Sequence, residues 1–433
     1  MFSTTLMALL GASICVAQVS TQPANLESLV DEALAANPSL SALQKRIATF
    51  EKRLPYAGAP PDPMMRFSLV NVPGVSLDFG RTPMSGKQIS LMQTLPFPGT
   101  LREKTTAAKE VVSAAESRLL DHRLQITRLV KVAYYDLAFY DQAIDITREN
   151  ETVVRSIAER ALARYEAGSG RQHDVLQAGV SLSLLSNRVT GFETSRRLAV
   201  VRLNGLLGRA PDGNLEIQVN VHVQDVTLSI DDLLAVAEHN SKTLRELTHQ
   251  IREWEARERV AQKTGLPTLT LSVAYRQRNA VPGDPAVGDD FLSAGIGLNL
   301  PVFRGRKQSA RAAEARATVQ WLQARFEEER QRLGTELQRI VVELQLHQSE
   351  QELFIEQVLP QTEQALRSAR SAYEADLVDF STLQNAQSTW LDAELMRFHH
   401  AVAHAKLLAE LEATVGISLQ DQFVQRPVDG GRP

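Results

Sequence analysis

The sequence predicts a mainly α-helical chain organised as two repeats, each with a β-hairpin and a pair of long antiparallel coiled-coil helices. Two stretches rich in proline and glycine, Leu95–Gly99 and Leu300–Gly305, each follow an alternating, strand-like segment and precede a long helical pattern. Each helical pattern then breaks after a tyrosine, and these two residues, Tyr165 and Tyr373, lie 208 positions apart. Landmarks that recur in the same order indicate a duplicated structural unit.

Composition excludes several classes of function. The chain has 433 residues, and its content of 43% hydrophobic residues is typical of a folded protein. Its formal net charge of −4 argues against a nucleic-acid binder. The only cysteine is Cys15, so a disulfide framework and a cysteine-based zinc site are excluded. Beyond the N-terminus, no run of apolar residues is long enough for a transmembrane helix.

The first residues, 1–17, read as a secretory signal with an apolar centre and a cleavage site after Ala17, although the usual positive charges at its start are missing. Lipid modification of Cys15 is the alternative, but it requires a small residue before the cysteine and Ile14 is not small. Residues 420–433 are expected to form a disordered tail. The working expectation is export from the cytoplasm.

The first repeat is assigned to residues 18–212. An opening helix over 26–54 is interrupted at Asn37-Pro38, and a group of prolines that begins with Pro55 is expected to exclude helix and lead into strands. Alternating apolar and polar residues predict a β-hairpin at about 64–95.

Long helices follow over about 100–208. From Leu101 to Glu166 the sequence contains neither proline nor glycine, and a helix of this length spans roughly 100 Å. The returning helix carries a heptad seam typical of coiled coils. Its members are Val175, Ala178, Leu182, Leu185, Val189 and Phe192. Breaks are expected at Gly205, at Gly208 and at Pro211–Gly213.

The second repeat, 213–419, has the same order: a β-hairpin at about 268–300 and long helices at about 305–416. Pro360 is expected to bend the outgoing helix, and the return is expected over 380–415. A second apolar seam lies on the outgoing helix. Its members are Leu333, Leu337, Ile340 and Leu344.

The strands have about the length that crosses an outer membrane, ~9–11 residues, and they divide into an apolar and a polar face. The residues predicted to face lipid are Leu269, Leu271, Val273, Ile296 and Leu298. A soluble sheet with one buried face is the alternative. Four strands cannot close a barrel, and open edges do not occur in lipid, so transmembrane β-strands imply an oligomer. Three copies supply twelve strands.

A segment at the first helical break combines Tyr165 and Gly168 with an Asp174-Val175-Leu176-x-Ala178 run. Together with the double unit, the proline-rich entries and the segment 202–208, it resembles the TolC-like outer-membrane efflux factors over nearly the whole mature chain. The resemblance implies a homotrimer with a twelve-stranded barrel in outer-membrane lipid and an α-helical tunnel in the periplasm. It also implies two partners, a periplasmic adaptor protein and an inner-membrane efflux pump, and an exit duct for drugs or metal ions.

By the same resemblance, the tips at about 165–175 and 373–383 form the tunnel entrance and the adaptor dock. The residues assigned to this site are Tyr165, Gly168, Asp174, Val175, Tyr373, Asp376, Asp379, Thr382 and Asn385. The positions of the family's acidic gate rings correspond to Thr382 and Asn385, which are not acidic. Asp376 and Asp379 lie close by, and we interpret them as ordinary turn acids, with Asp379 capping a helix.

The sequence contains no phosphate-binding loop, nucleophile elbow or zinc-protease motif, so no enzyme activity and no cofactor are expected. His400 and His404 share one helical face at a spacing that can bind a metal, but no local carboxylate completes a ligand set, and a packing or tunnel-wall role is favoured. The alternative function is a soluble periplasmic coiled-coil adaptor or scaffold, which requires no lipid-facing strands.

Overall fold

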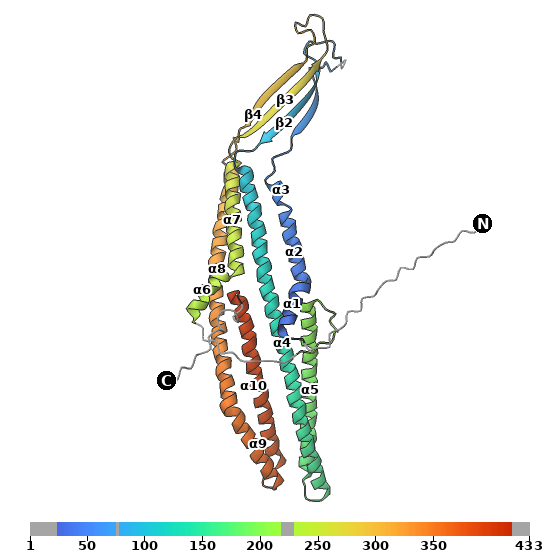
Figure 1. The fold of residues 1–433 in the computed structure, drawn as a ribbon, viewed down its shortest axis with the longest axis vertical. Coiled ribbons are helices and arrows are strands. Elements are labelled where there is room, and N and C mark those ends of the chain that lie inside the picture. The colour runs from blue at the N-terminus through green and yellow to red at the C-terminus, as the bar shows by residue number, and fades with distance from the viewer. Residues whose placement is uncertain (1–23, 75–77, 218–228, 418–433) are drawn as a thin grey trace, which may run out of the picture.

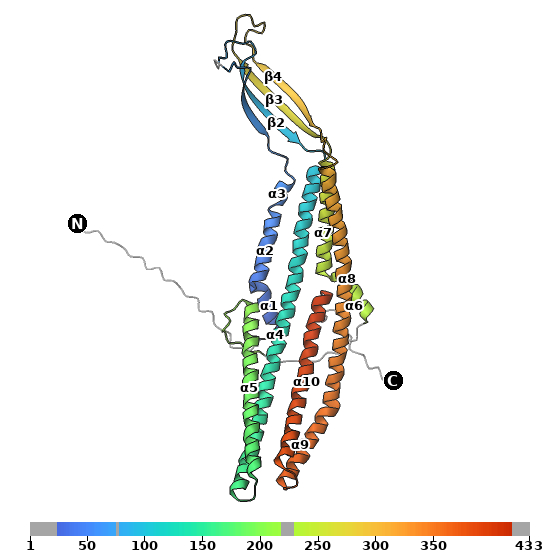
Figure 2. The ribbon, with the colours of Figure 1, turned by 180° about the vertical axis from the view of Figure 1, so that it is seen from behind.

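The computed structural model describes residues 24–74, 78–217 and 229–417. The predicted signal over 1–17 and the predicted tail over 420–433 lie outside these ranges. The described chain is a long, narrow body with a β-sheet at one end and two helical tips at the other (Figures 1 and 2). None of its helices combines the length and the apolar character that crossing a bilayer demands.

The chain opens with two short helices, α1 (Leu26–Ala36) and α2 (Pro38–Glu51). Asn37 separates them, because its side chain accepts the amide hydrogen of Ser39 and Pro38 follows in the first turn. Pro55 was expected to exclude helix, and this was wrong. It lies in the first turn of a four-residue helix, α3 (Leu54–Ala57), where a missing amide hydrogen costs nothing.

The four strands form one antiparallel sheet in the order β1-β2-β3-β4. They are β1 (Met64–Val70), β2 (Gly86–Leu95), β3 (Thr268–Arg278) and β4 (Phe291–Asn299). The two predicted hairpins are both present, and β2 pairs with β3 along its whole length. The sheet therefore joins segments that are far apart in the sequence.

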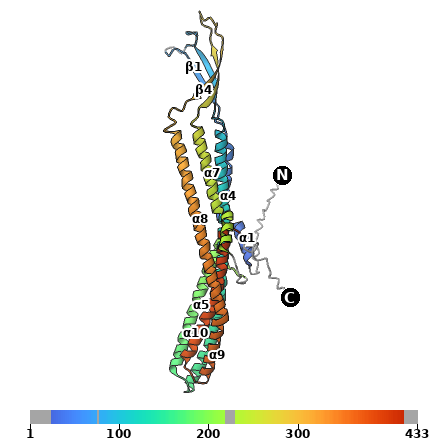
Figure 3. The same ribbon diagram turned by 90° about the vertical axis from the view of Figure 1, so that its left-hand side faces the viewer.

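Two outgoing helical segments run from the sheet to the tips. The first, α4 (Thr100–Glu166), is one helix of 67 residues, and Gly99 precedes it with a left-handed φ of 80°. The left-handed backbone is the reason for glycine here, because the side chain nearest to an added Cβ atom, that of Lys263, can move away. The second consists of α8 (Gln308–Leu353) and α9 (Leu359–Glu374), and α9 continues α8 down to the second tip (Figures 1 and 3).

A five-residue π-helix, Phe354–Val358, joins α8 to α9 and ends just before Pro360. Proline cannot donate to the carbonyl one turn earlier and its ring collides with that carbonyl, so the backbone widens locally. The expected effect of Pro360 thus takes the form of a π-helical turn.

The return helices α5 (Gln172–Leu207) and α10 (Phe380–Val415) stop about halfway along the body (Figure 1). They end at Gly208 and Gly416, both with left-handed φ. The break expected at Gly205 was wrong, because α5 continues through this residue to Leu207. The Asn37 side chain donates to the carbonyl of Leu206 at 2.8 Å, so the junction of α1 and α2 caps the end of α5.

Two further helices stand in the second half of the chain where α1 and α2 stand in the first half. They are α6 (Ile230–Asn240) and α7 (Lys242–Lys263), and α10 ends against their junction, with Gly416 close to the carbonyl of Asn240. Apart from the short α3, the order of elements therefore recurs: a pair of helices, two strands and a long outgoing helical segment, followed by a shorter return helix.

Both predicted seams pack as expected. Ala178 and Val189 are buried on α5, and Leu337 and Ile340 are almost fully enclosed on α8. Nearer the sheet, each half of the chain has its own core. Nearer the tips the cores are shared: Ile157 and Ala178 pack with Tyr373, Phe380 and Leu383. Packing across the two halves holds the tips together.

Candidate functional site: the sheet face and the helical tips

The strand register gathers the apolar side chains on one face of the sheet. Leu271 pairs with Ile296, Leu269 with Leu298 and Val273 with Leu91. Directly opposed residues of antiparallel strands point to the same side. Its apolar members are Met65, Phe67, Leu69, Ile89, Leu91, Leu95, Leu269, Leu271, Val273, Tyr275, Leu292, Ala294, Ile296 and Leu298, and the polar residues Lys87, Gln93 and Gln277 share this face.

This apolar face is open. Phe67 and Ile296 each keep 74% of their surface, and Leu271, Val273 and Leu298 are exposed as well. The helices lie beyond the end of the sheet and do not cover it (Figure 3). An apolar patch of this extent marks a surface that another apolar phase or molecule covers.

The opposite face is polar. Arg276 donates from Nε and Nη2 to Oε1 of Gln88, at 3.0 and 2.8 Å, and these two residues are directly opposed in the register. Ser272 lies on the same face and its hydroxyl donates to the carbonyl of Gly295. A sheet with one apolar and one hydrated face suits the wall between lipid and water.

At the other end of the body, the two tips have the same turn. Gly168 follows α4 with φ +73°, and Asp376 follows α9 with φ +58°. The amide of Gly168 donates to the carbonyl of Tyr165, and the amide of Asp376 donates to that of Tyr373. Aspartate tolerates the left-handed region better than most residues, although less well than glycine.

Arg164, on the last turn of α4, connects the first tip to the second. Its guanidinium donates to Asp376 Oδ1 at 2.8 Å and to the carbonyls of Tyr373 and Glu374 at 3.4 and 3.3 Å. The same group lies 5.7 Å from the centre of the Tyr373 ring. The sequence analysis did not assign Arg164 to this site. The signal that could have indicated it is a cation next to Tyr165 in one tip and several acidic residues in the other tip.

A cleft of about 270 Å³ lies between the two tips. Of the residues assigned to this site, it brings together Asp174, Tyr373, Asp376 and Asp379. Burial raises the pKa of Tyr373, and the nearby charge of Asp174 adds to this rise. The remaining assigned residues lie outside the lining of the cleft: Tyr165, Gly168, Thr382 and Asn385 are exposed, and Val175 is half-buried on α5.

Asp379 caps α10, in agreement with our interpretation. Its Oδ1 accepts from the hydroxyl of Thr382 at 2.7 Å, from the amide of Thr382 at 3.0 Å and from the hydroxyl of Ser381 at 2.9 Å. These bonds, led by the one from the Thr382 hydroxyl, lower the pKa of Asp379 from its ordinary 3.8 to about 2. The carboxylate is therefore a structural acceptor that stays charged.

The first prediction concerns this cap. Because the folded-state pKa lies below the unfolded value, the cap stabilises α10 above pH 3.8 and is lost as pH falls through about 2. Replacing Asp379 with alanine should speed hydrogen exchange at residues 380–383 at neutral pH, whereas Asp379→Ser, which can still cap, should restore most of the protection. Equal protection in the wild type and the alanine variant would refute the cap.

Comparisons with known proteins agree with this architecture. The sequence profile of the outer membrane efflux protein family matches residues 29–209 and again residues 233–413. Protein CyaE of Bordetella pertussis is 26% identical over 309 residues, which are 70% of this chain and 63% of CyaE. Outer membrane efflux protein BepC of Brucella suis is 23% identical over 251 residues, or 58% of this chain and 53% of BepC. The matches thus span less than two thirds of either relative.

Among solved structures, the outer membrane protein VceC from Vibrio cholerae superposes with a TM-score of 0.75 at 20% identity. The superposition covers 91% of this chain and 96% of VceC, so the fold is shared over nearly the whole length. The two segments that match the family profile include both hairpins, both pairs of long helices and both tips. On this evidence the chain belongs to the outer membrane efflux protein family.

Proposed function

We propose that the protein is the outer-membrane exit duct of a tripartite efflux system, extending from the outer membrane into the periplasm. The observation that carries this proposal is the open apolar face of the sheet, with Phe67, Leu271 and Ile296 exposed on it. Outer-membrane lipid is the covering that suits such a face, because lipid-facing and water-facing residues alternate along strands that cross a membrane.

The duct is proposed to be a homotrimer. Within the described chain, β1 and β4 are the outer strands of the sheet, and each pairs on one side only. Open strand edges do not occur within lipid, so β4 of one chain must pair with β1 of the next. Three copies of this four-stranded sheet make a twelve-stranded barrel, and the long helices continue it as a tunnel. The recurring order of elements supports a duplicated unit in each chain.

The tips are proposed to form the entrance to the tunnel and the dock for a periplasmic adaptor protein. They lie at the end of the body opposite to the sheet (Figure 2), which is the end that points toward the inner membrane in this orientation. An inner-membrane pump would deliver drugs or metal ions there and supply the driving energy. The two tips differ where Gly168 corresponds to Asp376, and the Arg164 guanidinium donates to the aspartate.

A soluble periplasmic adaptor or scaffold remains the alternative, and the open apolar face argues against it. Cell fractionation separates the two. We expect a trimer that stays with the outer membrane and dissociates only on heating. Release of the protein by osmotic shock would exclude the duct.

The second prediction concerns the contact between the tips. Arg164→Ala removes an exposed ion pair and a ring contact, each worth up to ~1 kcal/mol, together with two hydrogen bonds to carbonyls. A loss of about 1 kcal/mol shifts an equilibrium between tip positions about fivefold. We therefore expect a several-fold rise in single-channel conductance or open probability in planar bilayers.

Arg155→Ala is the matched control, since among the described residues Arg155 forms an ion pair with Glu151 alone, one turn away on the same helix. Its conductance should equal that of the wild type. If the wild-type channel conducts and neither variant changes its conductance, the Arg164 contact does not limit the entrance.

A further inference from the structure

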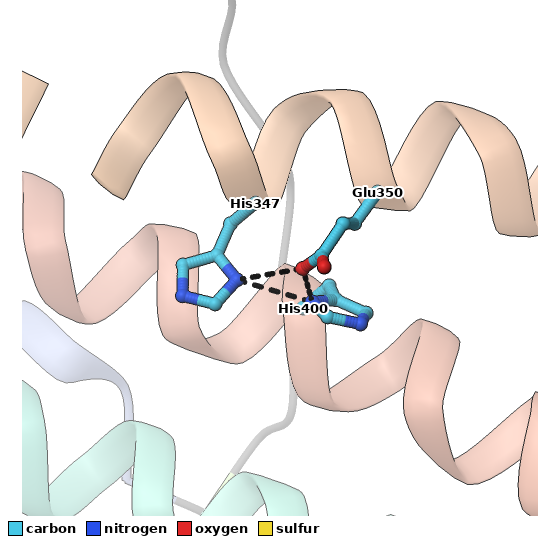
Figure 4. A group of neighbouring side chains, drawn as sticks. All are labelled: His347, Glu350 and His400. Carbon is cyan, nitrogen blue, oxygen red and sulfur yellow. Dashed lines mark hydrogen bonds and ion pairs between the residues drawn. The ribbon is translucent and has the colours of Figure 1, made fainter. Parts of the chain in front are cut away.

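Two histidines and one glutamate meet between the C-terminal end of α8 and α10. His347 and Glu350 are three residues apart on α8, and His400 projects toward them from α10 (Figure 4). The sequence pattern pointed to His400 with His404, and the structure places different partners around His400. Within the described ranges, this is the group of histidine, cysteine and acidic residues whose ligand atoms converge closely enough to hold a metal ion.

The ligand atoms form a small triangle. His347 Nδ1 lies 3.0 Å from His400 Nδ1, His400 Nδ1 lies 2.8 Å from Glu350 Oε2, and His347 Nδ1 lies 3.6 Å from the same oxygen. A tetrahedral zinc ion with bonds of about 2.0–2.1 Å requires separations of about 3.3 Å between its ligand atoms. The three measured distances average close to that value. An ion slightly above the plane of the three ligand atoms would reach all of them.

The three atoms suit a shared cation better than a shared hydrogen. If both imidazoles are neutral, the close contact of two Nδ1 atoms requires that one carries the hydrogen and the other accepts it. The hydrogen must be on His400 Nδ1, because otherwise a lone pair of His400 Nδ1 would point at the negatively charged Glu350 carboxylate. One hydrogen then serves two acceptors, His347 Nδ1 and Glu350 Oε2. A divalent ion accepts a lone pair from all three atoms at once.

We propose that His347, Glu350 and His400 bind a zinc ion that ties α8 to α10. Two imidazoles and one carboxylate are a ligand set that zinc uses when a fourth position is left for water. The site has a path for the ion and for that water, because the side chains of His347 and Glu350 keep 21% and 37% of their surface, whereas His400 keeps 8%.

The location gives the ion a mechanical role. The π-helical turn begins at Phe354, four residues after Glu350, and the Phe354 ring lies 5.4 Å from that of His400. The helix that carries two of the ligands is thus widened just beyond the site. Zinc would hold α8 against α10 immediately before this turn. This role does not require that metal ions are the cargo of the duct. The proposed zinc site therefore does not depend on the proposed transport function.

The third prediction tests the site on the full-length protein, purified in detergent and stripped with a chelator. We expect isothermal titration with zinc chloride to give one ion per chain. His347→Ala and Glu350→Gln should each weaken binding at least about tenfold, because each removes one of three protein ligands. Both positions are partly exposed, so these variants avoid the buried His400, whose replacement could prevent folding.

His239→Gln is the control, because His239 is an exposed histidine in the last turn of α6, far from this group along the chain. Its affinity for zinc should be unchanged. Cobalt(II) in place of zinc should give the absorption spectrum of a tetrahedral site in the wild type and in His239→Gln only. Stoichiometric zinc binding that persists in the double variant His347→Ala, Glu350→Gln, or no zinc binding by the wild type, would overturn the proposal.

Discussion

Replacing Leu271 with arginine is expected to block assembly of the proposed trimer in the outer membrane. Leu271 is the fourth residue of β3 and lies directly opposite Ile296 of β4, and both side chains lie on the exposed apolar face. An arginine at the middle of the lipid-facing side of a barrel costs about 2–4 kcal/mol in each chain, and a homotrimer incurs this cost three times. Ile296→Arg should behave in the same way.

The control for this experiment lies one residue away. Ser272 is on the polar face, which already carries Arg276, so Ser272→Lys should assemble normally. The measurement is the amount of heat-modifiable trimer in the outer-membrane fraction. Normal trimer yield from both Leu271→Arg and Ile296→Arg would show that this face does not contact lipid.

Leu337→Ala is expected to destabilise the helical body by about 2–5 kcal/mol, because it removes a fully enclosed side chain and leaves a cavity. Leu337 keeps 1% of its surface and belongs to the core that joins α8 to α6 and α10. This core adjoins the place where α10 ends against the junction of α6 and α7, so its loss should loosen the middle of the body.

The temperature at which the trimer dissociates on a gel is the suitable measurement, because unfolding of such an assembly is governed by its kinetic stability. Val342→Ala is the matched control, since Val342 is on the same helix and keeps 53% of its surface. Equal dissociation temperatures for the two variants would mean that the seam of α8 does not limit stability.

The sequence by itself determined the elements and their faces. The absence of proline and glycine between Leu101 and Glu166 was sufficient to predict one very long helix, because nothing in that segment interrupts the backbone hydrogen bonds. Alternation alone assigned Leu271 and Ile296 to one side of their strands. Both are local properties, since helical and strand periodicity depend on neighbours a few residues away.

Local rules failed where a distant contact or the position within a turn decided the outcome. Pro55 was tolerated because it stands in a first helical turn. The end of α5 beyond Gly205 is capped by Asn37, which lies 169 positions before Leu206, the residue whose carbonyl it binds. Neither fact can be read from the residues that surround these positions.

Only the tertiary structure decided which distant side chains meet. The pairing of β2 with β3 joins the two hairpins into one sheet with a single apolar face, and the sequence pattern is the same whether or not they pair. Arg164 reaches Asp376 across 212 positions, and His400 meets His347 and Glu350 across a pair of helices. The reason is physical: periodicity tells which way a side chain points, whereas helix packing and strand register determine what stands opposite to it.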